Sequence, residues 1–166
     1  MAEIPSDKMT LAICNPGKDP AVALAPTLPA DTLVISADAS AHAISRQGVK
    51  MDRLTWVDAT GKMFWKTAKE KDLPNWFFTE GPDALAHLSA LVATKVAKGK
   101  IKLVVLCKLN PIIASNGTEK SVEFIKYLIQ KLRALKVGFV LIAEEDADVK
   151  RLEKKIGGKF GRKIAI

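Results

Sequence analysis

Cysteine and histidine are scarce in this sequence. Its 166 residues include two cysteines, Cys14 and Cys107, and two histidines, His42 and His87. The cysteines stand in separate apolar stretches without CxxC spacing, and each histidine lies in a different segment of helical pattern. Zinc sites and disulfide frameworks need their residues in closer groups. The sequence therefore predicts no bound metal, no cofactor, and two buried, reduced thiols.

Long apolar runs are also missing. The run from Leu103 to Cys107 is among the longest, and it is far shorter than the roughly 18 residues of a membrane span. The stretch from Met1 to Asp7 has neither the basic region nor the apolar core of a secretory signal. These two absences predict a cytoplasmic protein with no membrane partner. Separately, residues 1–8 are expected to form a flexible N-terminus.

What the sequence does contain is a regular alternation of short apolar runs and helical patterns. With 48% hydrophobic residues and a length typical of one core, residues 1–166 are expected to form a single α/β domain. The alternation predicts a mostly parallel sheet of about five to seven strands with helices on both faces. The predicted strands are 9–14, 32–37, 54–58, 76–78, 101–107 and 137–143, and the predicted helices begin at Pro20, at 38–40, and at residues 82, 118 and 146.

Three segments leave more than one interpretation open. Residues 110–117 are predicted to be a loop, because Asn116-Gly117 is a typical turn pair. The tail 157–166 is predicted to add an edge strand or a hairpin. The stretch from Met63 to Asp72 has no pattern that distinguishes helix from loop. The apolar run 101–107 suits a strand buried on both faces, and we expect it at the centre of the sheet.

The second half of the chain resembles the RecA-like and KaiC-like ATPase core. The resemblance lies in the apolar strand Leu103–Leu109, the pair Asn116-Gly117, the helical segment Phe124–Ile129 and the turn Leu135–Gly138 before the last long strand. It extends more loosely over residues 9–145. It implies a RecA-like (P-loop NTPase-like) three-layer sandwich, and it points to uncharacterised archaeal relatives that lack intact Walker motifs.

The phosphate-binding loop that the resemblance implies is incomplete. The motif GxxxxGK[ST] wraps backbone N–H groups, a lysine and a hydroxyl around phosphates and Mg²⁺. Here Gly17-Lys18 is present, but Ala12 stands at the first glycine position and Asp19 at the hydroxyl position. A carboxylate at a helix N-terminus also takes the place that a phosphate would use.

The Walker-B position departs from the pattern as well. Cys107 stands where a magnesium-organising carboxylate is expected, and Lys108 follows it. A neutral thiol is a poor ligand for Mg²⁺, and an ammonium repels the ion. ATP hydrolysis by the usual mechanism is therefore not expected, and the sequence offers no catalytic residue.

Polar residues follow several predicted strands, where parallel sheets bind ligands: Asn15, Lys18, Asp38, Asp58, Lys108, Asn110 and the pair Glu144-Glu145. They could form an anion or metal site, or they could be ordinary caps and turns. Asp38 stands where a dinucleotide-binding fold places the carboxylate that binds the ribose, but the glycine-rich motif of that fold is missing. We therefore interpret Asp38 as a helix cap. The candidate residues for a vestigial nucleotide or anion site are Asn15, Gly17, Lys18, Asp38, Asp58 and Lys108.

Positive charge is the remaining functional signal. The net charge is +8, and cations concentrate in residues 95–108 and near the C-terminus. Such clusters are typical of contact with nucleic-acid phosphates, although heat-adapted proteins also carry lysine-rich solvated faces. Trp56, Trp65 and the run 76–78 could stack on bases, but core packing is favoured for most of them. The candidate nucleic-acid residues are Lys150, Arg151, Lys154, Lys155, Lys159, Arg162 and Lys163.

Three functions are compatible with these observations. The preferred hypothesis is a non-catalytic RecA/KaiC-like binding or regulatory domain with a basic surface. The first alternative is a sequence-nonspecific nucleic-acid-binding protein, and the second is a small-molecule enzyme using Asp38, Asp58 and Lys108. The apolar end Ile164–Ile166 suggests pairing of a sheet edge with a protein partner or a second copy.

Overall fold

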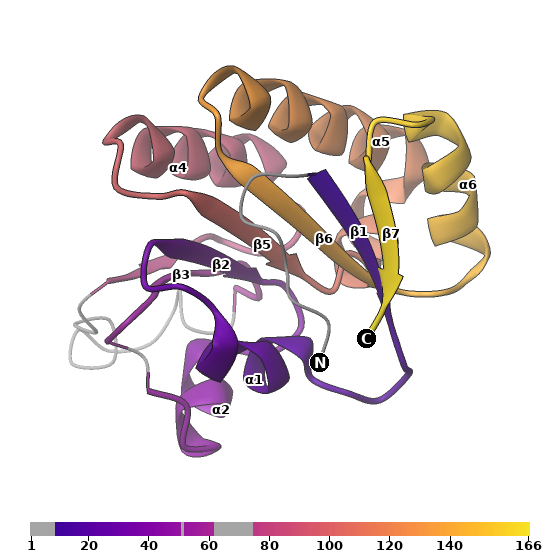
Figure 1. Cartoon of the computed structure of the whole chain (residues 1–166). Helices are drawn as coiled ribbons and strands as arrows, with labels where there is room; N and C mark the ends of the chain where they lie inside the picture. Colours follow the sequence, from indigo (N-terminus) through magenta and orange to yellow (C-terminus); the bar gives the residue numbers. More distant parts are fainter. Residues whose placement is uncertain (1–8, 51, 62–74) are drawn as a thin grey trace.

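A single sheet of seven strands forms the centre of the structure (Figure 1). The computed structural model describes residues 9–50, 52–61 and 75–166. In space the strands follow the order β4-β3-β2-β5-β6-β1-β7, and every neighbouring pair is parallel. The predicted sheet is confirmed, and β5 is its middle strand. The strands are β1 (Met9–Cys14), β2 (Thr32–Ser36), β3 (Thr55–Asp58), β4 (Trp76–Phe78), β5 (Leu103–Cys107), β6 (Gly138–Glu144) and β7 (Arg162–Ala165).

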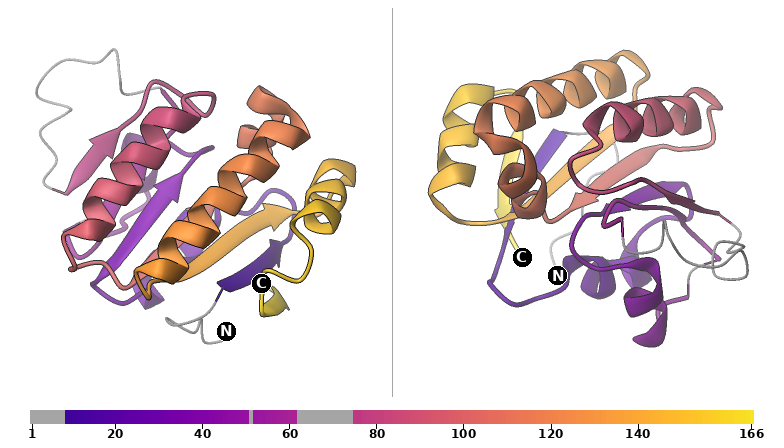
Figure 2. Two further views of the ribbon diagram at one scale, coloured as in Figure 1. Left: turned by 90° about the horizontal axis from the view of Figure 1, so that it is seen from above. Right: turned by 180° about the vertical axis from the view of Figure 1, so that it is seen from behind.

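Helices cover both faces of the sheet, which confirms the predicted three layers (Figures 1 and 2). The two short helices α1 and α2 lie on one face, and the longer α4, α5 and α6 lie on the other. No helix within the described ranges is long and apolar enough to cross a bilayer. The helices are α1 (Pro20–Leu24), α2 (Ala41–Arg46), α4 (Leu85–Ala97), α5 (Asn110–Ala134) and α6 (Ala147–Ile156), and a 3-10 turn, η1 (Ala25–Thr27), follows α1.

The strands supply two apolar cores because successive side chains point to opposite faces. Leu106 and Phe139 belong to the cluster that packs under α4, α5 and α6. Val105 and Trp56 belong to the cluster that packs against α1 and α2. All five residues of β5 are buried, as its continuous apolar sequence predicts for a strand covered on both sides.

Polar side chains begin the helices that follow β1, β2 and β6. Asp19, Ser40 and Asp146 each accept a hydrogen bond from a backbone N–H of the first helical turn. Asp19 caps α1, which begins at Pro20 as predicted. The cap of α2 is Ser40, so the interpretation of Asp38 as a helix cap was wrong.

Helix α5 begins eight residues earlier than the sequence indicated. Residues 110–117 were expected to be a loop, but the helix starts at Asn110 with Pro111 in its first turn. Proline has no backbone N–H, and in the first turn of a helix that N–H would have no acceptor within the helix. Gly117 interrupts it with φ 77° and ψ 165°. The Asn116 side chain donates to the carbonyls of Ile112 and Pro82, so the turn pair marks a kink between two helical pieces.

The tail adds a strand to the sheet edge beside β1. Residue Arg162 is in register with Thr10, and the strands are parallel, so the tail forms the predicted edge strand rather than a hairpin. The predicted flexible N-terminus, residues 1–8, and the open assignment of 63–72 lie outside the described residues.

Replacing Gly117 by alanine should destabilise the fold, because its φ and ψ lie in a region that essentially only glycine occupies. Apart from its chain neighbours and the backbone of its own helix, no atom lies within 4 Å of the added Cβ, so we attribute the cost to backbone strain. We expect a loss of about 1–3 kcal/mol in the free energy of unfolding, measured by chemical denaturation. Gly161→Ala is the control: its φ is not positive and its Cβ is unobstructed. An equal loss in both variants would contradict this explanation.

Candidate functional site

The candidate site lies at the carboxyl edge of the sheet, between β2 and β5. The chain leaves β2 through α2 toward β3 on one face, and it leaves β5 through α5 toward β6 on the other face (Figure 1). The connections therefore diverge at this pair of neighbouring strands. Parallel sheets bind ligands in the crevice that forms at such a switch point.

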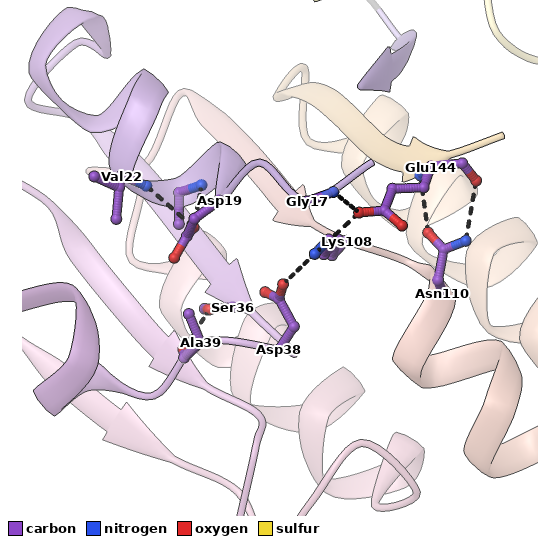
Figure 3. Close-up of polar contacts among 10 residues, drawn as sticks. Gly17, Asp19, Val22, Ser36, Asp38, Ala39, Lys108, Asn110 and Glu144 are labelled. Carbon is purple, nitrogen blue, oxygen red and sulfur yellow. Dashed lines mark hydrogen bonds and ion pairs between the residues drawn. The ribbon is translucent and has the colours of Figure 1, made fainter. Parts of the chain in front are cut away.

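Lys108 occupies this switch point (Figure 3). Its Nζ atom lies 2.9 Å from Oδ2 of Asp38, which follows β2, and 3.1 Å from Oε1 of Glu144, which ends β6. The three side chains are between 18% and 25% exposed. Lys108 has φ 60°, a left-handed conformation that non-glycine residues seldom adopt. One ammonium thus joins the ends of three strands.

The surroundings of Lys108 keep it charged. Burial by itself lowers the pKa of this ammonium, but the hydrogen bonds that it donates to Asp38 and Glu144, together with the negative charges of these carboxylates, raise the pKa well above its ordinary value. The side chain is therefore a cation across the physiological range. Both of its carboxylate partners belong to the same chain, so its charge is already compensated.

Glu144 makes a second contact that involves the turn after β1. The Gly17 N–H donates to Oε1 of Glu144 over 3.2 Å, the same oxygen that contacts Lys108. Asn110 fixes the backbone of Glu144: its Nδ2 donates to the Glu144 carbonyl (3.0 Å), and its Oδ1 accepts from the Glu144 N–H (2.9 Å). A carboxylate oxygen therefore lies between a loop N–H and a lysine ammonium (Figure 3).

The Asn15–Asp19 turn offers no further set of backbone N–H groups that could bind an anion. Asp19 accepts from the N–H groups of Ala21 (3.0 Å) and Val22 (3.3 Å), so its carboxylate covers the start of α1. Burial raises the pKa of Asp19, and the charge of Asp38 raises it further against the lowering effect of these hydrogen bonds. Asn15 and Lys18 are exposed. Among the described residues, Lys18 forms no ion pair.

Asp58 does not belong to the ion network. It is 1% exposed, and its Oδ2 accepts from the Ala41 N–H at 2.7 Å, at the start of α2. Its Oδ1 accepts from the N–H and the hydroxyl of Thr60. The carboxylate thus holds α2 and the turn after β3 in place, and its oxygens are engaged within the fold.

An open pocket of about 370 Å³ adjoins Lys108. Its lining includes four carboxylates, those of Asp38, Glu144, Asp146 and Asp148, against the single ammonium of Lys108. Arg151 lies 3.4 Å from Asp148. The lining is acidic overall, which opposes the approach of a polyphosphate. Within the described residues, no three Cys, His, Asp or Glu side chains are grouped as a metal site.

The two thiols are buried, as predicted. Burial raises the pKa of Cys14, and the charge of Glu144 adds to the effect. Burial is also the main cause of the raised pKa of Cys107, and the negative charges of Asp19 and Asp38 raise this pKa further. Because the thiolate is the reactive form, we expect both cysteines to be unreactive in the folded protein.

The predicted C-terminal cations fall into two groups. Lys150 lies 3.7 Å from Glu145, Arg151 pairs with Asp148, Lys163 lies 2.9 Å from Glu153, and Lys155 pairs with Glu119. In the part of the chain that the structure describes, Lys154, Lys159 and Arg162 have no ion-pair partner.

The aromatic residues support the core interpretation for two of the proposed stacking platforms. Trp56 is 0% and Trp76 is 5% exposed, and their rings stack with centroids 5.1 Å apart. Phe77 and Phe78 are half-buried, and Trp65 lies outside the described residues. Trp56 and Trp76 therefore pack within the fold and cannot stack on a base in this conformation.

The sequence did not identify the central role of Glu144 or Asn110. Glu144 and Gly17 are 127 residues apart, and only the position of β6 beside β1 brings them together. A carboxylate at the end of a buried strand was the one available signal, and it does not specify a partner.

Replacing Lys108 by methionine should destabilise the protein, because it leaves two partly buried carboxylates without their cation. We expect a loss of about 1–3 kcal/mol, less than for a fully buried pair because the groups are partly exposed. Since folding raises the pKa of Lys108, its contribution is complete below its ordinary value of 10.5 and declines only above that pH. Denaturation curves from pH 7 to 11 measure this.

Lys150→Met is the matched control, since its pair with Glu145 is exposed and should contribute less than about 1 kcal/mol. Equal losses in the two variants, or a Lys108 effect that disappears below pH 9, would contradict the ion network.

Native thiols should resist modification. We expect Cys14 and Cys107 to react with a disulfide reagent at pH 8 at least about 100-fold more slowly in the folded protein than in denaturant, because burial raises both pKa values and blocks access. Absorbance of the released thiol product measures the rates. Rapid reaction of one equivalent without denaturant would contradict the burial.

Comparison with known proteins supports the fold. No protein-family model and no curated protein matches the sequence. Among solved structures, the chain is similar to a KaiC-like protein from the hyperthermophilic archaeon Pyrococcus horikoshii, with 15% identity and a TM-score of 0.54. The match covers 85% of this chain and 62% of that protein, so the chain spans less than two thirds of the length of this neighbour. The predicted RecA/KaiC-like α/β fold is thereby confirmed.

Proposed function

We propose that this chain is a non-catalytic RecA/KaiC-like domain that acts as a binding or regulatory module. The observation that carries the proposal is the contact of Gly17 N–H and Lys108 Nζ with one oxygen of Glu144. In a nucleotide site, a loop N–H and a lysine contact phosphate oxygens. Here an internal carboxylate, that of Glu144, takes the place of a phosphate oxygen.

The charges around the network support the same function. The adjoining pocket has four carboxylates and one ammonium, so a polyphosphate would meet repulsion rather than compensation. Asp19 covers the start of α1, and Cys107, at the end of β5, is fully buried. Neither residue offers a contact to a nucleotide-bound metal ion.

A catalytic role for Asp38, Asp58 and Lys108 receives less support. Asp58 is engaged in holding α2, and Lys108 forms ion pairs with two carboxylates. A general acid or base needs a pKa near the working pH, whereas the pKa of Lys108 is raised. The regulatory function is therefore preferred over the enzyme hypothesis.

The wild-type protein should not bind nucleotide. Calorimetric titration with ATP and Mg²⁺ is expected to give no saturable heat, and thermal unfolding is expected to shift by less than about 1 °C at millimolar nucleotide. A stabilisation that rises with ATP concentration and saturates would overturn the proposal.

Removal of the internal carboxylate gives the converse test. In Glu144→Ala the Gly17 N–H and the Lys108 ammonium lose a shared partner, and we expect weak, saturable stabilisation by millimolar pyrophosphate that the wild type does not show. Glu145→Ala is the control, because it removes the same charge from the next, exposed residue. If pyrophosphate has the same effect on both variants, Glu144 does not occupy an anion position.

A further inference from the structure

Cations collect at the amino edge of the sheet, opposite the candidate site. In a parallel sheet every strand begins at the same edge, so residues that precede different strands become neighbours. Lys100 and Lys102 precede β5, Lys136 precedes β6, Lys159 precedes β7, and Arg162 begins β7. Lys98 ends α4 at the same edge. We call these six side chains the amino-end surface: Lys98, Lys100, Lys102, Lys136, Lys159 and Arg162.

Backbone contacts show that the amino-end surface is continuous. The Gly138 N–H donates to the Lys102 carbonyl (2.9 Å), which joins the starts of β5 and β6. Next to β6 comes β1, and the Gly161 N–H donates to the Met9 carbonyl (3.0 Å), which adds the start of β7. Neighbouring strands lie about 4.8 Å apart, so the row from β5 to β7 extends over about 14 Å. The Arg133 side chain also donates to the Lys159 carbonyl and joins the end of α5 to this row.

The six cations are available to a partner. All are exposed, and none forms an ion pair with another described residue. In contrast, Lys150, Arg151, Lys155 and Lys163 each have a carboxylate partner. Several acidic residues, including Asp38, Glu144 and Asp146, lie at the opposite edge. The described residues directly before β5, β6 and β7 include no carboxylate, so this part of the sheet separates charge along the direction of its strands.

Helix stabilisation does not explain this arrangement. Cations near a helix C-terminus interact favourably with the helix dipole, and this accounts for Lys98. Lys100, Lys102, Lys159 and Arg162 lie outside the helices, where the helix dipole gives no such benefit. The positive charge of Lys98 also affects the neighbouring Lys95: burial lowers the pKa of Lys95, and the charge of Lys98 lowers it further.

We propose that the amino-end surface binds the sugar-phosphate backbone of nucleic acid without sequence preference. Clustered, unpaired lysines and an arginine suit phosphates, and binding through phosphates alone carries no sequence information. Among the described residues, Tyr127 and Leu135 are the only exposed large apolar side chains. Leu135 adjoins Lys136, but a single leucine does not make the apolar centre of a protein interface or the apolar face of a membrane-surface helix. The proposal is independent of the closed nucleotide site, because the two occupy opposite edges.

Fluorescence polarisation with labelled 20-nucleotide RNA and DNA, single- and double-stranded, tests the proposal over a series of salt concentrations. We expect saturable binding at about 50 mM salt that weakens steeply as salt rises. Lys102→Gln, Lys136→Gln and Arg162→Gln, combined in one variant, remove one cation from the start of each of three strands. This variant should lose at least about 10-fold in affinity, and its log–log salt slope should be shallower by about 2–3.

The control variant combines Lys150→Gln, Arg151→Gln and Lys155→Gln, which remove the same charge from cations that already have partners. It should retain binding within about 2-fold, with thermal unfolding of both variants confirming their folds. No binding of any nucleic acid at 50 mM salt, or equal losses in the two variants, would overturn the proposal. Binding to anionic phospholipid vesicles in the absence of nucleic-acid binding would also overturn it. The RNA and DNA arms identify which backbone is preferred.

Discussion

The position of one ammonium group, that of Lys108, determines how the carboxyl edge of this sheet is organised. It contacts carboxylates from the ends of β2 and β6, and through Glu144 it reaches the turn after β1. Burial of a cation is unfavourable unless opposite charges and hydrogen bonds compensate it. Asp38 and Glu144 provide that compensation, and Asn110 holds Glu144 in position from the start of α5. Ion pairs and hydrogen bonds thereby connect four strand ends at the edge where parallel sheets bind ligands.

The same topology explains why the two edges of the molecule differ in charge. Parallel strands place all their first residues at one edge and all their last residues at the other. Lys102, Lys136 and Arg162 therefore become neighbours although 60 residues of sequence separate the first from the last. Asp38 and Glu144 become neighbours at the opposite edge by the same rule. The likeness to the KaiC-like protein of Pyrococcus horikoshii shows the fold alone, so both functional proposals need the support of these local charges.

Much of the architecture was predictable because local patterns determine it. The apolar run of β5 indicated a strand buried on both faces, and the structure confirms it at the centre of the sheet. Asp19 before Pro20 indicated a helix start, and both residues take those roles. The beginning of α5 was mistaken because Asn116-Gly117 is equally suited to a turn and to a kink between helical pieces. Nothing local distinguishes the two, since tertiary packing determines whether residues 110–116 become helical.

The candidate site was predictable only as a set of strand-end residues. Lys108, Asp38 and Gly17 were recognised one by one, and the structure connects them through Glu144. Asp58 was placed in the same set, but its hydrogen bonds are to the start of α2 and to Thr60. The reason is strand order: only the positions of β6 beside both β1 and β5 bring Glu144 to Gly17 and Lys108. The pattern of a single sequence gives no information about that order.

Nuclear magnetic resonance of the Gly17 amide can distinguish the internal contact from nucleotide binding, because this N–H donates to Glu144. In a titration of isotope-labelled protein with ATP and Mg²⁺, we expect the Gly17 resonance to stay in place up to millimolar nucleotide. A saturable shift of the Gly17 amide, accompanied by a change at the Lys108 ammonium, would show that phosphate displaces the internal carboxylate and that the site still binds nucleotide.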